Sequence, residues 1–390
     1  MRKLGFDKKV IPLLLIFCAL FNGAAWCSKE FADFYTDNIF PVITVPYGFF
    51  TSLFPFSVGE ILLVVAVVLV LLSVLSGVVL LAYAIRAFAV RRAGHKRAPS
   101  SDGRNGSGFE RVRFAIMAFF RGMAVLLSVV LTVMSLNCFV LYHCTPLRVA
   151  GSEHTYTVAE LAQLRDFIVE KCNYLATLMP RDEDGYVSYP GDMAKTAKQA
   201  MQGISDRYER LDYYYVTPKA LTFSGFMSQQ YMQGYYFPFS MEANYNDEMY
   251  IMNKPFTMCH ELAHTHGYIY EDEANFLGFL SCTESDDIVF VYSGYLGVLS
   301  YVNNDFYRSV DRETYSSHVA ILDQVREDDR FLTEDAWKRV EERAVLDTEA
   351  VKRAADAFID TNLKVNGISD GKASYSHLVG LLLGYYYSQD

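Results

Sequence analysis

The segment His260-Glu261-Leu262-Ala263-His264 has the residue types and spacing of a metal site that carries its own base. On a helix, residues four apart lie on one face about one turn apart, so His260 and His264 can bind one tetrahedral metal ion. Glu261 cannot bind the same ion in that geometry. It projects beside the ion, where it can take a proton from a metal-bound water. The segment therefore predicts a Zn²⁺ site with Glu261 as the catalytic base.

A third metal ligand is expected soon after the histidines. Apolar residues around the motif predict a buried helix, and Gly267 predicts where it stops. Residues 271–277 then predict a second helix. Thermolysin-like zinc peptidases complete their site with a Glu from such a helix, and an Asp or Asn four residues later hydrogen-bonds a metal-bound His. Glu271 and Asn275 have this spacing, and Glu273 is the fallback ligand.

Three apolar runs predict helices that cross a membrane. They lie at about residues 10–26, 61–88 and 114–142, and they are too long and too uniformly apolar for core helices. The first run follows basic residues and contains Gly23-Ala24-Ala25, so a cleaved signal peptide is an open alternative for it. Three passes are the expected count.

Charge is distributed unevenly along the 390 residues. Residues 1–143 hold 14 of the 35 basic and 7 of the 45 acidic residues, a net charge of +7, whereas the remainder carries −17. This asymmetry predicts a membrane anchor at 1–143 and a soluble domain at 144–390, and it argues against nucleic-acid binding. The basic loop at 89–113 is expected in the cytoplasm, which places the C-terminal domain outside the cytoplasm in a multi-pass protein of the cell membrane.

The seven cysteines show neither the spacing of a metal site nor that of a disulfide framework. Cys172, Cys259 and Cys282 lie in apolar contexts and are expected to be buried thiols. A soluble domain held together by disulfides is therefore not expected.

The region after the anchor is predicted to be mainly helical. Thr157 and Glu160 predict a capping box at the start of a helix. Residues 242–252 predict a strand directly before the metal helix. It is either an edge strand that pairs with a substrate backbone or a hairpin without that role. Further helices are expected at residues 193–211 and 292–301, once or twice within 333–363, and as a terminal packing helix around 378–385.

Side chains that contact the substrate are harder to assign. Hydrolysis of a peptide bond forms an oxyanion, which needs a hydrogen-bond donor. The candidate donors are Tyr292, Tyr295, His266 and His318. The candidates for lining the cleft are Glu242, Asn244 and Asn246. His266 lies two residues beyond His264, so it is expected to point away from the metal, as a surface residue or one that supports a ligand.

Four segments in combination resemble one protein family. They are residues 54–60, 234–246, 255–267 and 271–277, which read Phe-Pro-Phe-Ser-Val-Gly-Glu, Gly-Tyr-Tyr-Phe-Pro-Phe-Ser-Met-Glu-Ala-Asn-Tyr-Asn, Pro-Phe-Thr-Met-Cys-His-Glu-Leu-Ala-His-Thr-His-Gly and Glu-Asp-Glu-Ala-Asn-Phe-Leu. The combination resembles the bacterial domain-of-unknown-function 3810 family, whose members are membrane-anchored and carry HExxH. The resemblance covers about Phe34 to Tyr301, and more loosely the residues beyond.

This resemblance implies a mainly α protein. Three transmembrane helices would precede an α+β, thermolysin-like (gluzincin-type) zinc metallopeptidase domain with a small edge sheet and the HExxH helix. Zn²⁺ would be held by His260, His264 and Glu271, and Glu261 would move protons. The implied partners are the membrane bilayer and a peptide or protein substrate whose identity does not follow from the sequence.

Two other interpretations compete with a zinc metalloendopeptidase. An intramembrane protease also uses HExxH, but acidic residues follow this motif too closely for it to lie in a spanning segment. The other alternative is a non-catalytic membrane receptor or scaffold with a structural zinc site. Glu261 favours the hydrolase, because a structural site has no use for a carboxylate beside its ligands.

Overall fold

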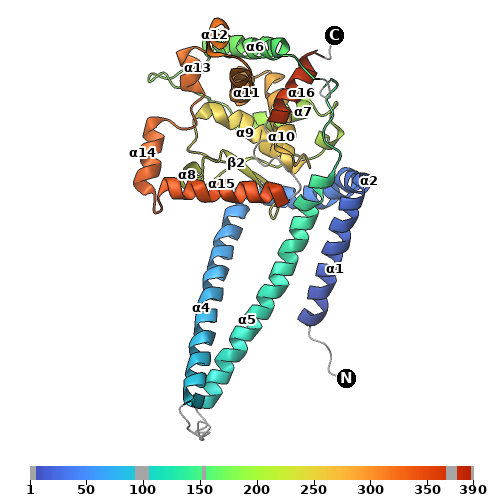
Figure 1. The fold of residues 1–390 in the computed structure, drawn as a ribbon, viewed down its shortest axis with the longest axis vertical. Coiled ribbons are helices and arrows are strands. Elements are labelled where there is room, and N and C mark those ends of the chain that lie inside the picture. The colour runs from blue at the N-terminus through green and yellow to red at the C-terminus, as the bar shows by residue number, and fades with distance from the viewer. Residues whose placement is uncertain (1–5, 93–104, 152–154, 366–375, 388–390) are drawn as a thin grey trace. The chain divides into compact units, whose positions relative to one another are not determined.

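Helices make up most of the chain, together with one small sheet (Figure 1). The computed structural model describes residues 6–92, 105–151, 155–365 and 376–387, so residues 93–104 of the basic loop lie outside the described residues. The chain divides into two units. Unit 1 comprises residues 1–23 and 59–135, and unit 2 comprises residues 24–58 and 136–390.

Unit 1 contains the long apolar helices. The three predicted runs lie in α1 (Phe6–Cys27), α4 (Val58–Arg92) and α5 (Asn105–Met134). The stretches Lys8–Cys27, Val58–Arg86 and Glu110–His143 are each long and apolar enough to cross a membrane. Polar side chains join α1 to the end of α5, since Asn22 Nδ2 donates to Ser135 Oγ at 2.8 Å. These helices indicate a membrane protein.

A labelling experiment can test on which side of the membrane the residues after about 143 lie. We expect Asp184→Cys, in a Cys27→Ser background, to react with a membrane-impermeant maleimide on intact cells, because the Lys/Arg bias places residues after about 143 outside. Asp184 is exposed, and Cys27 is the one exposed cysteine of the chain. A matched Ser101→Cys variant in the basic loop should react only after permeabilisation. Protection of the Asp184→Cys variant from the reagent in intact cells would contradict the topology.

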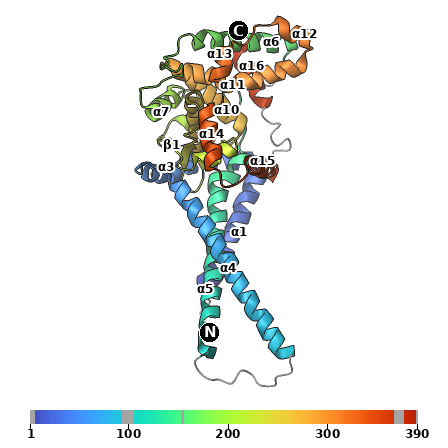
Figure 2. The ribbon, with the colours of Figure 1, turned by 90° about the vertical axis from the view of Figure 1, so that its left-hand side faces the viewer.

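Unit 2 begins with a segment for which the sequence predicted no structure. It contains α2 (Lys29–Phe34), one turn of π-helix, η1 (Tyr35–Ile39), and α3 (Phe40–Ser52). Ser28 caps α2, since its Oγ accepts a hydrogen bond from the backbone N–H of Phe31 at 3.1 Å. α3 lies at the periphery of unit 2 (Figure 2).

The sheet has three short strands in the order β1-β3-β2. β1 (Lys219–Ala220) is parallel to β3 (Glu242–Tyr245), and β2 (Gly234–Phe237) is antiparallel to β3. The strand predicted at 242–252 is therefore shorter and lies in the centre of the sheet. The edge strand nearest the metal helix in this sheet is β2, which forms from a segment for which no strand was predicted.

The remaining predicted helices are present, with shifted ends. Thr157 and Glu160 form the predicted capping box of α6 (Val158–Ala176). The helix predicted at 193–211 stops early, and residues 333–363 form two helices. The other elements are η2 (Ser135–Phe139), η3 (Leu141–His143), α7 (Met193–Gly203), η4 (Glu209–Leu211), α8 (Ser224–Gln229), η5 (Ile251–Asn253), α12 (Arg312–Ser317), α13 (Asp323–Asp328), α14 (Glu334–Arg343), α15 (Thr348–Val365) and α16 (Ser376–Tyr387).

Three helices form the centre of unit 2 and carry a large share of its core. They are α9 (Lys254–Thr265), α10 (Glu271–Thr283) and α11 (Ile288–Ser309). α9 and α10 approach closely at Gly278, where an added Cβ would lie 3.3 Å from the backbone nitrogen of His260. The buried thiols of Cys259 and Cys282 lie 3.7 Å apart across this interface, and all seven cysteines, each within the described residues, are free. The predicted buried thiols are thus confirmed.

Candidate metal centre

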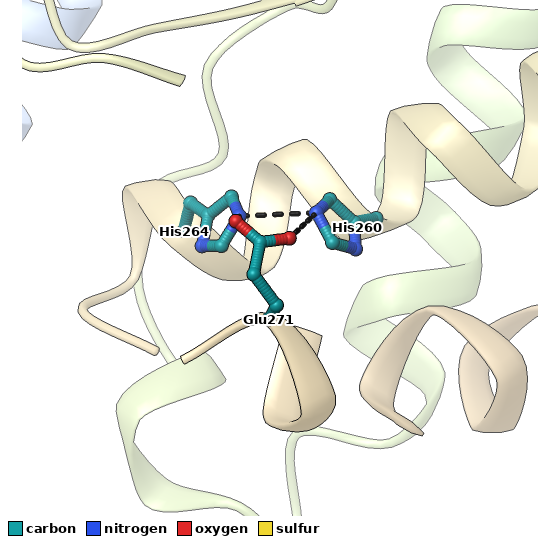
Figure 3. Close-up of side chains that lie close together, drawn as sticks. All are labelled: His260, His264 and Glu271. Carbon is teal, nitrogen blue, oxygen red and sulfur yellow. Dashed lines mark hydrogen bonds and ion pairs between the residues drawn. The ribbon is translucent and has the colours of Figure 1, made fainter. Parts of the chain in front are cut away.

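The side chains of His260, His264 and Glu271 lie together between α9 and α10 (Figure 3). The Nε2 atoms of the two histidines are 3.0 Å apart. Glu271 Oε2 lies 3.3 Å from His260 Nε2, and its Oε1 lies 3.8 Å from His264 Nε2. Two imidazole nitrogens and a carboxylate oxygen thus point to one place, and these three residues could hold a metal ion.

A tight turn after α9 delivers Glu271 to the histidines. His266 ends the helix, and Gly267 follows with φ of +86°, a left-handed conformation that glycine adopts without strain. The predicted stop is confirmed. Three further residues lead directly into α10, whose first residue is Glu271. The next two residues are also acidic, which suits the positive end of the helix dipole.

A hydrogen bond fixes the orientation of His264. Its Nδ1 lies 2.7 Å from the carbonyl oxygen of Tyr268, so Nδ1 carries the proton and donates it. The opposite nitrogen, Nε2, is then left with a free lone pair that faces His260 and Glu271. Burial, together with the charge of the neighbouring His260, lowers the pKa of His264 to about 4. His264 is therefore neutral near pH 7, as a metal ligand must be.

His260 and Glu271 influence each other's protonation in the metal-free cluster. Burial raises the pKa of Glu271, but the hydrogen bond with His260 and the charges of both histidines outweigh burial and lower it to about 2. Burial lowers the pKa of His260, but Glu271 outweighs it and raises the value. A metal ion that binds His260 Nε2 must therefore displace a proton.

Glu261 lies beside the cluster and has few hydrogen-bond partners. It is buried, and burial raises its pKa to about 8. The backbone of Tyr236 in β2 lies close enough to the carboxylate to counteract part of this rise in pKa, but Oε2 has no hydrogen-bond partner among the described residues. β2 can come this close because residue 234 is glycine: an added Cβ there would lie 2.7 Å from Glu261 Oε1 and 2.6 Å from the backbone oxygen of Asn244.

The outer edge of β2 faces Glu261. In an antiparallel pair, alternate residues exchange hydrogen bonds with the partner strand and the others point away. Asn246 N donates to Gln233 O at 2.7 Å, and the register pairs Tyr235 with Asn244. The backbone groups of Gly234 and Tyr236 therefore point away from β3, and the contact between Tyr236 and Glu261 is consistent with this direction.

Two further side chains lie next to the cluster, one of which was predicted from the sequence and one of which was not. Asn275, predicted to support a metal-bound His, is buried and contributes hydrogen bonding that raises the pKa of His260. Asn275 and His260 lie close together without a full hydrogen bond between them, since His260 Nδ1 has no hydrogen-bond partner in the described part of the chain. Tyr301 was not predicted. Burial, the charge of Glu271 and a hydrogen bond with Asn275 act on its hydroxyl, with a net rise of its pKa to about 12.

Glu273 lies away from the cluster. Its Oε1 accepts a hydrogen bond from the backbone N–H of Leu147 at 2.5 Å, and burial raises its pKa to about 8. Glu273 therefore joins α10 to the chain that follows η3, and it is not placed to bind the same ion as His260.

The structure places the other candidates of the sequence elsewhere. Tyr292 donates to Asp328 at 3.0 Å, and Tyr295 packs against Phe167 and Phe279. His318 bonds Asp166 at 2.7 Å. Each of these three side chains thus has a partner outside the cluster of His260, His264 and Glu271, and none of them is retained as the candidate donor to an oxyanion.

His266 is also corrected, because it is neither a surface residue nor a support for a ligand. Its ring is buried between the rings of Tyr213 and Tyr215, with centroids 4.3 and 4.2 Å away. Burial lowers the pKa of His266 to about 4. It packs as a neutral core residue.

The three candidates from β3 and its end have structural contacts. Glu242 is buried and pairs with Lys219, its Oε1 lying 2.5 Å from Nζ. Asn246 donates to Ser228 Oγ at 2.9 Å and to Met232 O at 3.1 Å. Only Asn244 keeps a buried oxygen, Oδ1, without a partner within the described ranges. Of these three candidates, Asn244 is therefore the one that stays a candidate for a substrate contact, although its side chain is fully buried.

A pair of variants separates the two glutamates of α10. We expect Glu271→Gln to weaken zinc binding by more than the roughly 10–100-fold typical of a lost supporting residue, because it removes a donor atom. Glu273→Gln should leave zinc affinity nearly unchanged, since Glu273 bonds Leu147. Asn275→Ala should fall between them, at about 10–100-fold. Competition with a chromophoric chelator measures all three, and loss of zinc from Glu273→Gln alone would contradict the assignment.

A family model described as "Protein of unknown function (DUF3810)" matches residues 35–383. The chain belongs to this family. The matched range includes α3, two of the three membrane-length helices, the metal cluster and most of α16. No curated protein and no solved structure matches the chain.

Proposed function

We propose that this protein is a membrane-anchored, zinc-dependent metallopeptidase that hydrolyses peptide bonds. The observation that carries the proposal is a buried carboxylate, Glu261, with an oxygen that lacks a partner in the described chain, beside the cluster of His260, His264 and Glu271. A buried, unsatisfied polar atom is costly and needs a reason. A role in moving protons supplies one.

The donor set supports zinc as the metal. Zinc bonds to nitrogen and oxygen measure about 2.0–2.2 Å, so donors of a tetrahedral site are about 3.3–3.6 Å apart. The separations between the cluster's donor atoms, 3.0, 3.3 and 3.8 Å, lie around these values. Two histidines and one glutamate also leave a fourth position for water or substrate, as catalytic sites do. When bound, zinc would act as a Lewis acid and lower the pKa of a water molecule.

The chain's own groups then have distinct tasks. His264 is held in one orientation by Tyr268 O, and His260 and Glu271 complete the metal site. Glu261 accepts a proton from the attacking water and delivers it to the leaving amine. Tyr301, near Glu271 and Asn275, replaces Tyr292 and Tyr295 as the candidate donor to the oxyanion.

The outer edge of β2 offers a place for the substrate backbone. Gly234 and Tyr236 direct their backbone groups away from β3. An extended peptide can add to such an edge through main-chain hydrogen bonds. A peptide on this edge would pass next to Glu261, because Gly234 lies against that carboxylate.

The proposal predicts an activity that depends on zinc. Full-length protein in lipid nanodiscs should contain one zinc per chain by elemental analysis and should hydrolyse fluorescein-labelled casein, an unfolded general substrate. Removal of the metal with 1,10-phenanthroline should abolish hydrolysis, and added zinc should restore it. Stoichiometric zinc without hydrolysis of casein or of a randomised peptide library would instead favour a receptor or scaffold with a structural zinc. Protein that binds no zinc would overturn the proposal.

A further inference from the structure

The segment between the first two membrane-length helices has a large uncovered apolar surface. Its exposed side chains are Phe34, Ile39, Val42, Ile43, Tyr47, Phe49, Phe50, Leu53 and Phe56, and Trp26 is exposed at the end of α1 directly before it. No charged residue occurs from Asn38 to Gly59. Soluble surfaces rarely present a contiguous apolar patch of this kind, and such patches mark sites of contact with proteins or membranes.

The opposite face of the segment packs against the rest of unit 2. Phe40, Thr44, Gly48 and Thr51 are buried at the spacing of one helix face. Tyr47 donates to Phe239 O at 2.6 Å, and Thr51 Oγ1 donates to Ser240 O at 3.0 Å. The apolar face is therefore held outward by a fixed helix.

Two acidic residues of this segment, Asp33 and Asp37, pair with other parts of unit 2. Asp33 accepts hydrogen bonds from Thr145, at 2.8 Å from its backbone nitrogen. Asp37 pairs with Arg210 at 2.6 Å. Lys29 and Glu30 are exposed at the start of α2, whereas from Asn38 onward the exposed side is mainly aromatic and aliphatic.

We propose that this face of α2, η1 and α3 rests in the interface of the lipid bilayer. The chain on both sides supports lipid as the occupant, because α1 ends at Cys27 and α4 begins at Val58, and both are membrane-length helices. At 13 residues, α3 is too short to span a bilayer of about 30 Å. Exposed Trp, Tyr and Phe side chains suit the headgroup region.

The inner face of the same segment reaches towards the metal cluster. A Cβ at Gly267, in the turn that ends α9, would lie 2.7 Å from Thr36 Cγ2. Gly48 lies against Met241, whose Sδ is 3.1 Å from the Tyr236 hydroxyl. The Tyr236 ring in turn lies 6.3 Å from that of His264. Packed elements are about 10 Å apart, so the cluster lies on the order of 10–20 Å from the lipid-facing side.

The short distance between the cluster and the lipid-facing side limits which substrates can reach the site. This inference rests on the proposed function. An extended chain advances about 3.3 Å per residue, so 10–20 Å corresponds to roughly 3–6 residues. The substrates are therefore segments of membrane-spanning or lipid-anchored proteins that lie close to the bilayer surface.

Fluorescence quenching tests the membrane contact without using activity. Full-length protein with Trp26→Phe and Trp337→Phe receives Phe50→Trp and is placed in nanodiscs that contain lipids with brominated acyl chains. Tyr307→Trp is the matched control, because Phe50 is 56% exposed and Tyr307, in α11, is 55% exposed. Phe50→Trp should be quenched strongly and Tyr307→Trp hardly at all. Leu53→Trp repeats the test if the first variant does not fold.

Absence of quenching at both Phe50→Trp and Leu53→Trp would overturn the contact with lipid. Cross-linking of two chains through this face in the same discs would then identify a second copy as the occupant. Neither result would contradict the proposed peptidase activity, because that activity is tested separately by hydrolysis of casein.

The substrate class has its own test. Single-span reporters carry a casein-derived sequence at 5, 15 or 40 flexible residues from the bilayer, in the same nanodiscs as the protein. Cleavage at 5 residues should exceed that at 40 residues by about tenfold or more. Equal rates at all three spacings would overturn the substrate class while leaving the peptidase intact. Failure to cleave any reporter or free casein, with quenching present, would overturn the peptidase and leave the lipid contact.

Discussion

Replacement of Glu261 by Gln should lower the rate of peptide hydrolysis by about 10²–10⁴-fold, the usual contribution of a general acid–base group. Gln has nearly the same shape but cannot accept the proton. Zinc should remain stoichiometric, because Glu261 is outside the ligand set of His260, His264 and Glu271. The measurement is kcat on labelled casein, with zinc content determined on the same sample.

Glu273→Gln is the matched control for this variant. Glu273 is also a buried glutamate whose pKa burial raises to about 8, but it bonds Leu147 rather than facing the cluster. We expect it to keep both zinc and activity. An active Glu261→Gln enzyme would remove the base from the mechanism, and loss of zinc from this variant would change the ligand set.

The second large effect concerns stability. Lys219→Met should lower the free energy of unfolding by about 3–5 kcal/mol, because it leaves the buried Glu242 carboxylate without its positively charged partner. Lys219 Nζ lies 2.5 Å from Glu242 Oε1 and 2.7 Å from the carbonyl oxygen of Thr51, so the variant also loses a bond to α3. Urea unfolding of the full-length protein, followed by circular dichroism, measures the change.

Lys254→Met provides the comparison for Lys219→Met. Lys254 pairs with Asp247 at 2.6 Å, but that carboxylate is 56% exposed. Exposed pairs contribute about 0–1 kcal/mol, so this variant should be nearly neutral. Equal destabilisation by the two substitutions would show that burial does not distinguish the two ion pairs.

The features that the sequence predicted best depend on local geometry. The spacing of His260 and His264 defines one helix face, and Gly267 with a short turn leaves Glu271 little freedom in where it can lie. The membrane-length helices and the capping box of α6 also depend on neighbouring residues alone. Such patterns need no knowledge of which distant segments pack together.

The sheet and α3 depend on contacts between distant segments. Strands of two and four residues have too little periodicity to reveal their neighbours, so the sequence did not show that β2 is the edge and β3 the centre. α3 lacks charged residues on any face. Without an alternation of polar and apolar residues, its helical period was hidden.

The choice between tyrosines failed for a related reason. Tyr292 and Tyr301 are nine residues apart on α11, which places them on opposite faces of the helix. Tyr292 reaches Asp328, whereas Tyr301 lies near Glu271. Which face of α11 meets α10 is decided by packing of the core, and the sequence of α11 alone does not contain that information.

The close approach of α9 and α10 has a consequence for which ion the site accepts. Gly278 lies two turns after Glu271 on the same face of α10, and a methyl group there would press on the backbone of His260 at 3.3 Å. Metal–ligand distances tolerate only about 0.2 Å of change. The absence of a side chain at Gly278 therefore lets α10 approach α9 closely, which sets the distance between the Glu271 carboxylate and the imidazoles of His260 and His264. If the cluster binds a metal as proposed, the backbone spacing at Gly278 would influence the preferred ion size, and Gly278→Ala should change it although the ligand residues His260, His264 and Glu271 remain the same.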